Sequence, residues 1–257
     1  MAKLGRGQCP PARWGVLVKT LAVVSRKGGA GKTTVAVNLT MAARAMGVKA
    51  VLADADPQRS ACDVLKGREE AGGLIVETSA AKLFTLIEAS RRSGAELLII
   101  DTPAGPEADV AEAVRVADLS LTVARPTYLD LAAAVRSVAI IQRLGKDGLI
   151  VLNQCAPPRN GVEPPQVVKA LEALRFAGLP VAATALRNRV AYQTAFAQMR
   201  SVLELEGQAA ASAEVRALFG ELWRRLRGER AAPVRTANDD LGRAFGAKPG
   251  LKLAPTA

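Results

Sequence analysis

One segment near the N-terminus combines glycines, lysines and threonines in an order that suits phosphate binding. The segment "SRKGGAGKTT" covers residues 25–34, follows an apolar run and precedes a stretch with helical periodicity. Glycines let backbone N–H groups turn toward an anion, and a helix N-terminus adds partial positive charge. Lys32 would reach the β- and γ-phosphates of a nucleotide, Thr33 would coordinate Mg²⁺, and Thr34 would donate to the α-phosphate. The other residues of this predicted site are Lys27, Gly28, Gly29, Ala30 and Gly31.

Three aspartates stand at the ends of apolar runs. Asp101 ends "LLIID", a pattern typical of a carboxylate that holds Mg²⁺ through water. Asp54 and Asp56 lie in "DADPQRS", where another apolar run ends. Any one carboxylate could instead cap a helix or a turn, but parallel strands present their ligands at one common edge. The sequence therefore predicts a metal site with Thr33 and Asp101. Asp54 and Asp56 alternate on an extended segment, so one of them can face the metal while the other faces the γ-phosphate and an attacking water.

Short apolar runs alternate with helical stretches along most of the chain. We expect strands over 20–25, 49–56, 73–80, 96–105, 119–126, 148–155 and 179–186. Helices are expected over 32–47, 80–94, 107–117, 129–144, 164–177 and 212–228. This order predicts an α/β fold, a mostly parallel twisted sheet with helices on both faces. We expect residues 1–18 to form a basic N-terminal extension, residues 19–228 one domain that carries the phosphate-binding loop, and residues 229–257 a tail without periodicity.

The composition is strongly basic. Lysine and arginine number 35 against 24 acidic residues, so the net charge is +11. This excess indicates a polyanionic partner, nucleic acid or an anionic membrane surface, although arginines that only solvate the surface are an alternative. The chain has no histidine, and its three cysteines lack the spacing of a zinc site. The chemistry must therefore use carboxylates, lysines, hydroxyls and backbone amides. Since no apolar run is long enough to span a bilayer, we expect a cytoplasmic protein.

Three motifs, "KGGAGKTT", "DADPQRS" and "IIDTPAG", resemble in this order the motifs of the ParA/MinD family of deviant Walker A ATPases. The second motif is most similar to the ParA branch, and the resemblance runs from about Thr20 to about residue 227. It implies ATP and Mg²⁺ as cofactors and catalytic roles for Lys27, Lys32 and Asp56.

The resemblance also implies individual roles. Lys27 would be the signature lysine that contacts phosphates across the interface of an ATP-sandwich homodimer, and Gly28 would lie where two backbones approach closely. Asp56 would position or activate the attacking water, while Asp54 would support the Mg²⁺ shell. Asn153, at the end of "GLIVLNQ", would read the adenine edge unless it is only a turn residue.

Relatives carry DNA-binding arginines in the segment that corresponds to residues 186–207. The resemblance thus implies nonspecific, salt-sensitive binding of DNA, although a solvated helix face explains any single arginine equally well. The candidates are Arg187, Arg189, Arg200, Arg216, Arg224, Arg225 and Arg227. The expected function is a nucleoid-associated ParA-like ATPase that positions a plasmid, chromosome origin or protein complex. A ParB-like or cargo-adaptor protein would stimulate its slow hydrolysis.

The alternative is a MinD-like ATPase that cycles on the membrane and regulates division or flagellar placement. The expected helix over 212–228 carries aromatic residues and arginines, as a membrane-binding helix would. Its apolar stripe, however, is no wider than core packing requires. We therefore expect this helix in the core and no stable membrane association.

Overall fold

A single sheet organises the part of the chain that the computed structural model describes, residues 17–65 and 73–229. Its order is β3-β2-β4-β1-β5-β6, and all neighbouring strands are parallel. The expected parallel α/β fold is confirmed. The strands are β1 (Lys19–Val24), β2 (Ala50–Asp54), β3 (Ile75–Glu77), β4 (Leu97–Asp101), β5 (Leu119–Ala124) and β6 (Gly148–Leu152).

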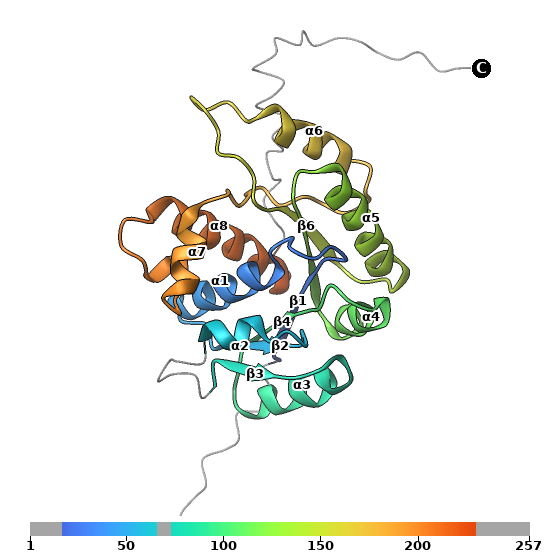
Figure 1. Cartoon of the computed structure of the whole chain (residues 1–257). Helices are drawn as coiled ribbons and strands as arrows, with labels where there is room; N and C mark the ends of the chain where they lie inside the picture. The colour runs from blue at the N-terminus through green and yellow to red at the C-terminus, as the bar shows by residue number, and fades with distance from the viewer. Residues whose placement is uncertain (1–16, 66–72, 230–257) are drawn as a thin grey trace, which may run out of the picture.

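Helices cover both faces of this sheet (Figure 1). They are α1 (Lys32–Ala45), α2 (Ser60–Leu65), α3 (Leu83–Arg92), α4 (Glu107–Val116), α5 (Tyr128–Arg143), α6 (Pro165–Leu174), α7 (Val190–Ala197) and α8 (Ala209–Leu226), with 3-10 turns η2 (Ala80–Lys82) and η3 (Val202–Glu204). Along β1, Leu21 and Val23 pack with α1 and α8, whereas Ala22 and Val24 pack with α4. This period of two places both faces of a central strand in the core, as its continuous apolar run requires.

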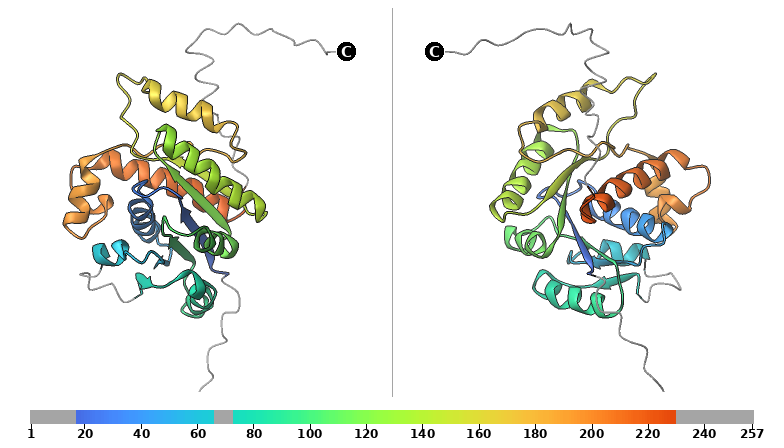
Figure 2. Two further views of the ribbon diagram at one scale, coloured as in Figure 1. Left: turned by 45° about the vertical axis from the view of Figure 1, so that its right-hand side comes forward. Right: turned by 180° about the vertical axis from the view of Figure 1, so that it is seen from behind.

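The helix expected over 212–228 is α8, and it lies beside α1 on one face of the sheet (Figure 2). Trp223 is partly buried against the core and five further apolar residues are buried in it, which confirms that the stripe serves packing. The five are Val215, Leu218, Phe219, Leu222 and Leu226. In the described parts of the chain, no helix combines the length and hydropathy needed to cross a bilayer.

The prediction of a strand over 179–186 is wrong, because this segment is not a regular strand. The segment runs beside β6 and makes only isolated bridges, which join Val181 to Ile150 and Arg187 to Cys155. The backbone N–H of Ala182 donates to Ile150 at 2.7 Å, but the next donor to β6 is Leu186, which bonds Leu152 at 2.9 Å. A regular ladder would use the second residue after Ala182, so the pairing is interrupted over 183–185, where the N–H of Ala183 donates to Glu221 Oε2 at 3.0 Å.

Two boundaries of the predicted domains lie near the limits of the described residues. Most of the N-terminal extension (1–16) and nearly all of the tail (230–257) lie outside them.

The short helix α2 was not predicted from the sequence. It follows the turn after β2 and contributes to the site described next.

Candidate functional site

The glycine-rich loop joins β1 to α1 at the carboxyl edge of the sheet, as predicted. Gly29 and Gly31 have φ values of 75° and 95°, in the left-handed region that favours glycine. At Gly31 space is a second reason, because an added Cβ would lie 2.2 Å from Asn153 Nδ2. The loop therefore has the alternating backbone that directs N–H groups toward an anion.

Lys32 is the first residue of α1 and only 7% exposed. Burial lowers the pKa of its ammonium group, and the charges of Asp101 and Asp56 oppose this shift. The three predicted residues are therefore close enough to interact electrostatically. They combine a buried cation with two carboxylates beside a phosphate-binding loop.

Asp101 ends β4 and is fully buried. Neither of its carboxylate oxygens has a hydrogen-bond partner among the described residues. Burial raises the pKa of Asp101 to about 7, and the nearby Thr33 and Lys32 oppose the shift. An unpartnered buried carboxylate close to a threonine hydroxyl fits Mg²⁺, which prefers oxygen ligands.

Mg²⁺ is usually held by one or two carboxylates together with substrate phosphates rather than by a complete protein cage. The described residues contain no cluster of three or more acidic, cysteine or histidine side chains able to hold a metal. Thr33 and Asp101 would therefore supply the protein part of the shell, and the nucleotide would supply the rest.

Asp54 ends β2 and is fully buried, and its contacts are local. Its Oδ1 accepts from the backbone N–H of Asp56 at 3.2 Å and its Oδ2 from that of Cys62 at 3.0 Å. Burial raises the pKa of Asp54, and these N–H groups oppose the shift. The carboxylate thus holds α2 against the end of β2, and its predicted support of the metal stays a prediction.

Asp56, half-buried in the turn after β2, accepts from the backbone N–H of Gln58 at 2.9 Å. Its charge acts on both Lys32 and Asp101. The predicted catalytic carboxylate therefore lies at the same edge as the loop, without a buried partner that would prevent it from meeting a water.

Lys27 is half-buried at the front of the loop. Burial raises the pKa of Asp130, but the hydrogen bonds from Arg125 and Thr127 and the charges of Arg125 and Lys27 together lower it. Asp130 accepts from Arg125 Nε at 2.9 Å and from Thr127 Oγ1 at 2.6 Å. Asp130 was not predicted from the sequence, although its place in the first turn after the strand expected over 119–126 was a signal.

Two side chains that follow β6 bind the outer side of the loop. Asn153 Nδ2 donates to the carbonyl of Ala30 at 2.8 Å, and Gln154 Nε2 donates to that of Gly29 at 3.2 Å. The structure thus brings Asn153 to the phosphate loop. Gln154 was missed, and its position next to Asn153 at a strand end was the available signal.

The seven candidate arginines separate into two groups. Arg187 pairs with Glu163, Arg189 with Glu214 at 2.5 Å, and Arg225 with Glu221 at 3.4 Å. Arg227 pairs with Glu229 and lies 5.9 Å from the Trp223 ring centroid. Arg200, Arg216 and Arg224 are exposed, with no ion pair found among the described residues.

Comparison with known proteins agrees with this geometry. Residues 21–204 match the family model described as the CobQ/CobB/MinD/ParA nucleotide binding domain. The chain belongs to this family. It is 34% identical over 200 residues, 76% of this chain and 89% of the relative, to maintenance of carboxysome distribution protein A of Gloeobacter kilaueensis.

Solved structures of the family share the fold. A Cyanothece McdA variant in complex with ATP gives a TM-score of 0.66 at 18% identity, covering 83% of this chain and 98% of that one. The septum site-determining protein MinD of Pyrococcus horikoshii with Mg-ADP gives 0.65 at 18% identity, covering 83% and 99%.

Asp101→Asn should stabilise the nucleotide-free protein, and more at pH 8 than at pH 6. Because the native pKa is raised from 3.8 to about 7, the folded chain keeps a proton that the unfolded chain releases. The contribution of this group to stability therefore falls as pH rises from about 4 through 7. Between pH 6 and 8 the wild type should lose about 1.4 kcal/mol, about 3–5 °C in Tm, relative to the variant. Thermal melts check this, and an equal difference at both pH values would contradict it.

Proposed function

We propose that this chain is a ParA-like ATPase whose ATP-bound form is a sandwich homodimer that binds nonspecific DNA and positions a cargo. The observation that carries the proposal is the meeting of Lys32, Asp56 and the unpartnered Asp101 beside a left-handed glycine loop. Lys32 would bind phosphate, Asp56 would orient a water, and Asp101 would hold Mg²⁺.

The chemistry would be phosphoryl transfer to water. Bound Mg²⁺ would neutralise charge on the β- and γ-phosphate oxygens. Lys32 would bind the same phosphates, and Asp56 would orient the attacking water. Lys27, delivered by the partner subunit, would add positive charge where it develops in the transition state. A catalytic site completed only on assembly accounts for slow basal turnover and for stimulation by a partner protein.

Gly28 supports the dimer. It does not have a positive φ, and an added Cβ would meet nothing within 4 Å in this chain. Neither backbone conformation nor crowding within the described part of one subunit therefore requires glycine at this position. Close approach of a second backbone would supply the missing reason, as the resemblance implies.

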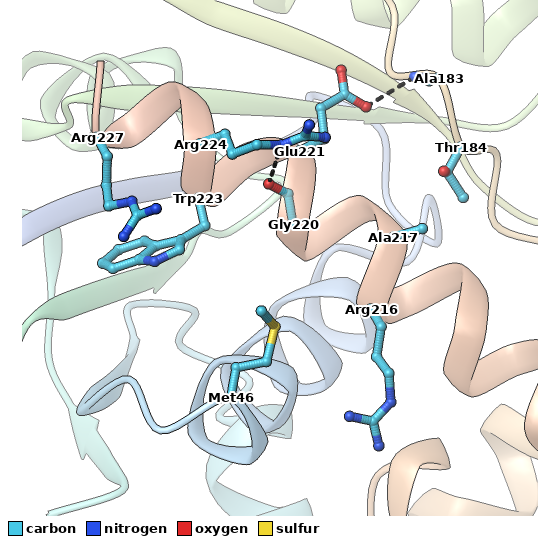
Figure 3. A pocket seen from close by; sticks show the side chains of 10 residues that line it. All are labelled: Met46, Ala183, Thr184, Arg216, Ala217, Gly220, Glu221, Trp223, Arg224 and Arg227. Carbon is cyan, nitrogen blue, oxygen red and sulfur yellow. Dashed lines mark hydrogen bonds between the residues drawn. The ribbon is translucent and has the colours of Figure 1, made fainter. Parts of the chain in front are cut away.

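A basic groove on α8 supports DNA binding. Arg216, Arg224 and Arg227 line it together with Trp223, and Met46 faces them from the end of α1 (Figure 3). Arg224 Nε donates to the carbonyl of Gly220 at 3.1 Å. This bond holds the Nε end of the guanidinium against α8, while the residue as a whole stays exposed. Exposed arginines along one helix suit phosphate contacts that carry no sequence information.

Replacing Arg216 and Arg224 together with glutamate should weaken binding of the ATP form to DNA about tenfold or more at 0.1 M salt. Each lost phosphate contact should also reduce the salt slope by about 0.9. Fluorescence anisotropy with a random duplex, repeated over a salt series, measures both. The matched control is Lys82→Glu with Arg92→Glu, two exposed cations at the two ends of the η2–α3 segment on the opposite face. Equal weakening by both pairs would contradict a DNA site on α8.

The MinD-like alternative is tested by sedimentation with liposomes of anionic lipid. Because the apolar side of α8 is buried, we expect ATP to increase retention on DNA and not on liposomes. ATP-dependent liposome binding without DNA binding would favour the alternative. The carboxysome-distribution relative supports a protein assembly as the cargo, rather than a plasmid or a chromosome origin.

A further inference from the structure

Asn153 and Gln154 hold two consecutive carbonyl groups of the phosphate loop. Their side-chain amides donate to Ala30 and Gly29, at 2.8 and 3.2 Å respectively. The residues belong to one dipeptide that directly follows β6, so the end of a core strand fixes both contacts. Such contacts act on the backbone of the loop.

The direction of each carbonyl fixes the direction of the next N–H group. The peptide bonds of the loop are trans, so a carbonyl and the following N–H point in opposite directions. With its carbonyl held by Gln154, Gly29 leaves the N–H of Ala30 pointing away from that side chain. In the same way, the contact of Asn153 turns the N–H of Gly31 away. These are two successive donors of the anion nest.

We propose that Asn153 and Gln154 are positioning residues that preorganise the phosphate nest. Gln154 has a φ of 54°, a left-handed conformation that is uncommon for a residue other than glycine. Backbone bonds on both sides maintain it: the N–H of Asn153 donates to Ala124 at 2.8 Å and that of Cys155 to Leu186 at 3.0 Å. The structure thus maintains an unfavourable backbone conformation at the residue whose side chain reaches the loop.

This role predicts an effect that does not depend on the base. An adenine-reading residue discriminates ATP from GTP, whereas a nest-positioning residue affects every ligand that presents phosphate. The inference rests on the proposed binding of ATP at this loop. Its test uses inorganic pyrophosphate as well, because pyrophosphate has phosphates and no base.

The test compares Gln154→Met with the wild type. Methionine keeps the length and neutrality of the side chain and removes the donor. Gln154→Gly is the second variant, because glycine accepts a positive φ without strain. Gln154 is exposed, so both variants should fold, and their Tm should match that of the wild type. Gln198→Met, an exposed position at the end of α7, is the matched control.

Displacement of a fluorescent ATP analogue gives the affinities for ATP, GTP and pyrophosphate. We expect both Gln154 variants to bind all three about fivefold more weakly, with the ATP-to-GTP ratio unchanged. Asn153→Ala should weaken pyrophosphate at least as much. Unchanged pyrophosphate binding in the variants, or a loss confined to ATP, would overturn the inference and leave the proposed function intact. A wild type that binds none of the three would contradict both.

Discussion

Lys32→Gln should weaken ATP binding at least a hundredfold, as measured by isothermal titration calorimetry. The ammonium group is buried at the start of α1, where it would make charge-assisted hydrogen bonds to phosphate in a site with little water. A hundredfold change corresponds to about 2.8 kcal/mol, a reasonable cost for losing a buried cation opposite phosphate charge.

The fold should tolerate this change. Because burial lowers the pKa of Lys32, the charged side chain is held at a cost in the nucleotide-free protein. The Tm of Lys32→Gln without nucleotide should therefore equal or exceed that of the wild type. Lys49→Gln, which removes an exposed lysine from the segment before β2, should leave ATP affinity unchanged. Normal affinity in Lys32→Gln would mean that the loop does not bind phosphate as described.

Asp56→Ala should bind ATP normally and lose about a hundredfold or more of its turnover. Asp56 lies at the nucleotide edge without being part of the glycine loop, and a positioned general base contributes a factor of this size. Since the bound ATP would persist, the dimer should accumulate and stay on DNA. Phosphate release under multiple turnover, measured with ATP affinity, separates the loss of chemistry from the loss of binding.

The matched control for this prediction is Asp147→Ala. Asp147 is an exposed aspartate just before β6, at the opposite edge of the sheet from the loop. Its removal changes the net charge equally and should leave turnover unchanged. A wild-type rate in Asp56→Ala would remove Asp56 from the catalytic machinery.

The strands of this fold were predictable where burial on both faces produces a continuous apolar run. Such runs located β1, β4 and β5 within a residue or two, apart from their carboxyl ends. The segment over 179–186 has a similar composition but is not a regular strand, because its bonds to β6 skip from Ala182 to Leu186. Within the skipped part, the N–H of Ala183 donates to Glu221, 38 residues away, and no local pattern predicts that contact.

The residues of the site also differ in how far the sequence predicts them. The glycine loop and Asp101 belong to local motifs, so the motifs and the order of the strands predicted their positions. The arginines do not: Arg187 and Arg189 find their carboxylate partners, Glu163 and Glu214, 24 and 25 residues away. Gln154 likewise acts on a loop 125 residues earlier. Sequence pattern predicts the charge of such residues, and only the fold shows which of them are already paired.

ATP should join two subunits through Lys27. Multi-angle light scattering after size exclusion distinguishes dimer from monomer, with the wild type, Lys27→Gln and Gly28→Ala each in Mg-ATP or Mg-ADP. Arg26→Gln is the matched control, because Arg26 pairs with Glu107 of its own subunit at 2.9 Å. We expect a doubled mass with ATP for the wild type and Arg26→Gln, and a monomer for Lys27→Gln and Gly28→Ala although both bind ATP. A wild type that stays monomeric with ATP, or a Lys27→Gln variant that dimerises like the wild type, would contradict it.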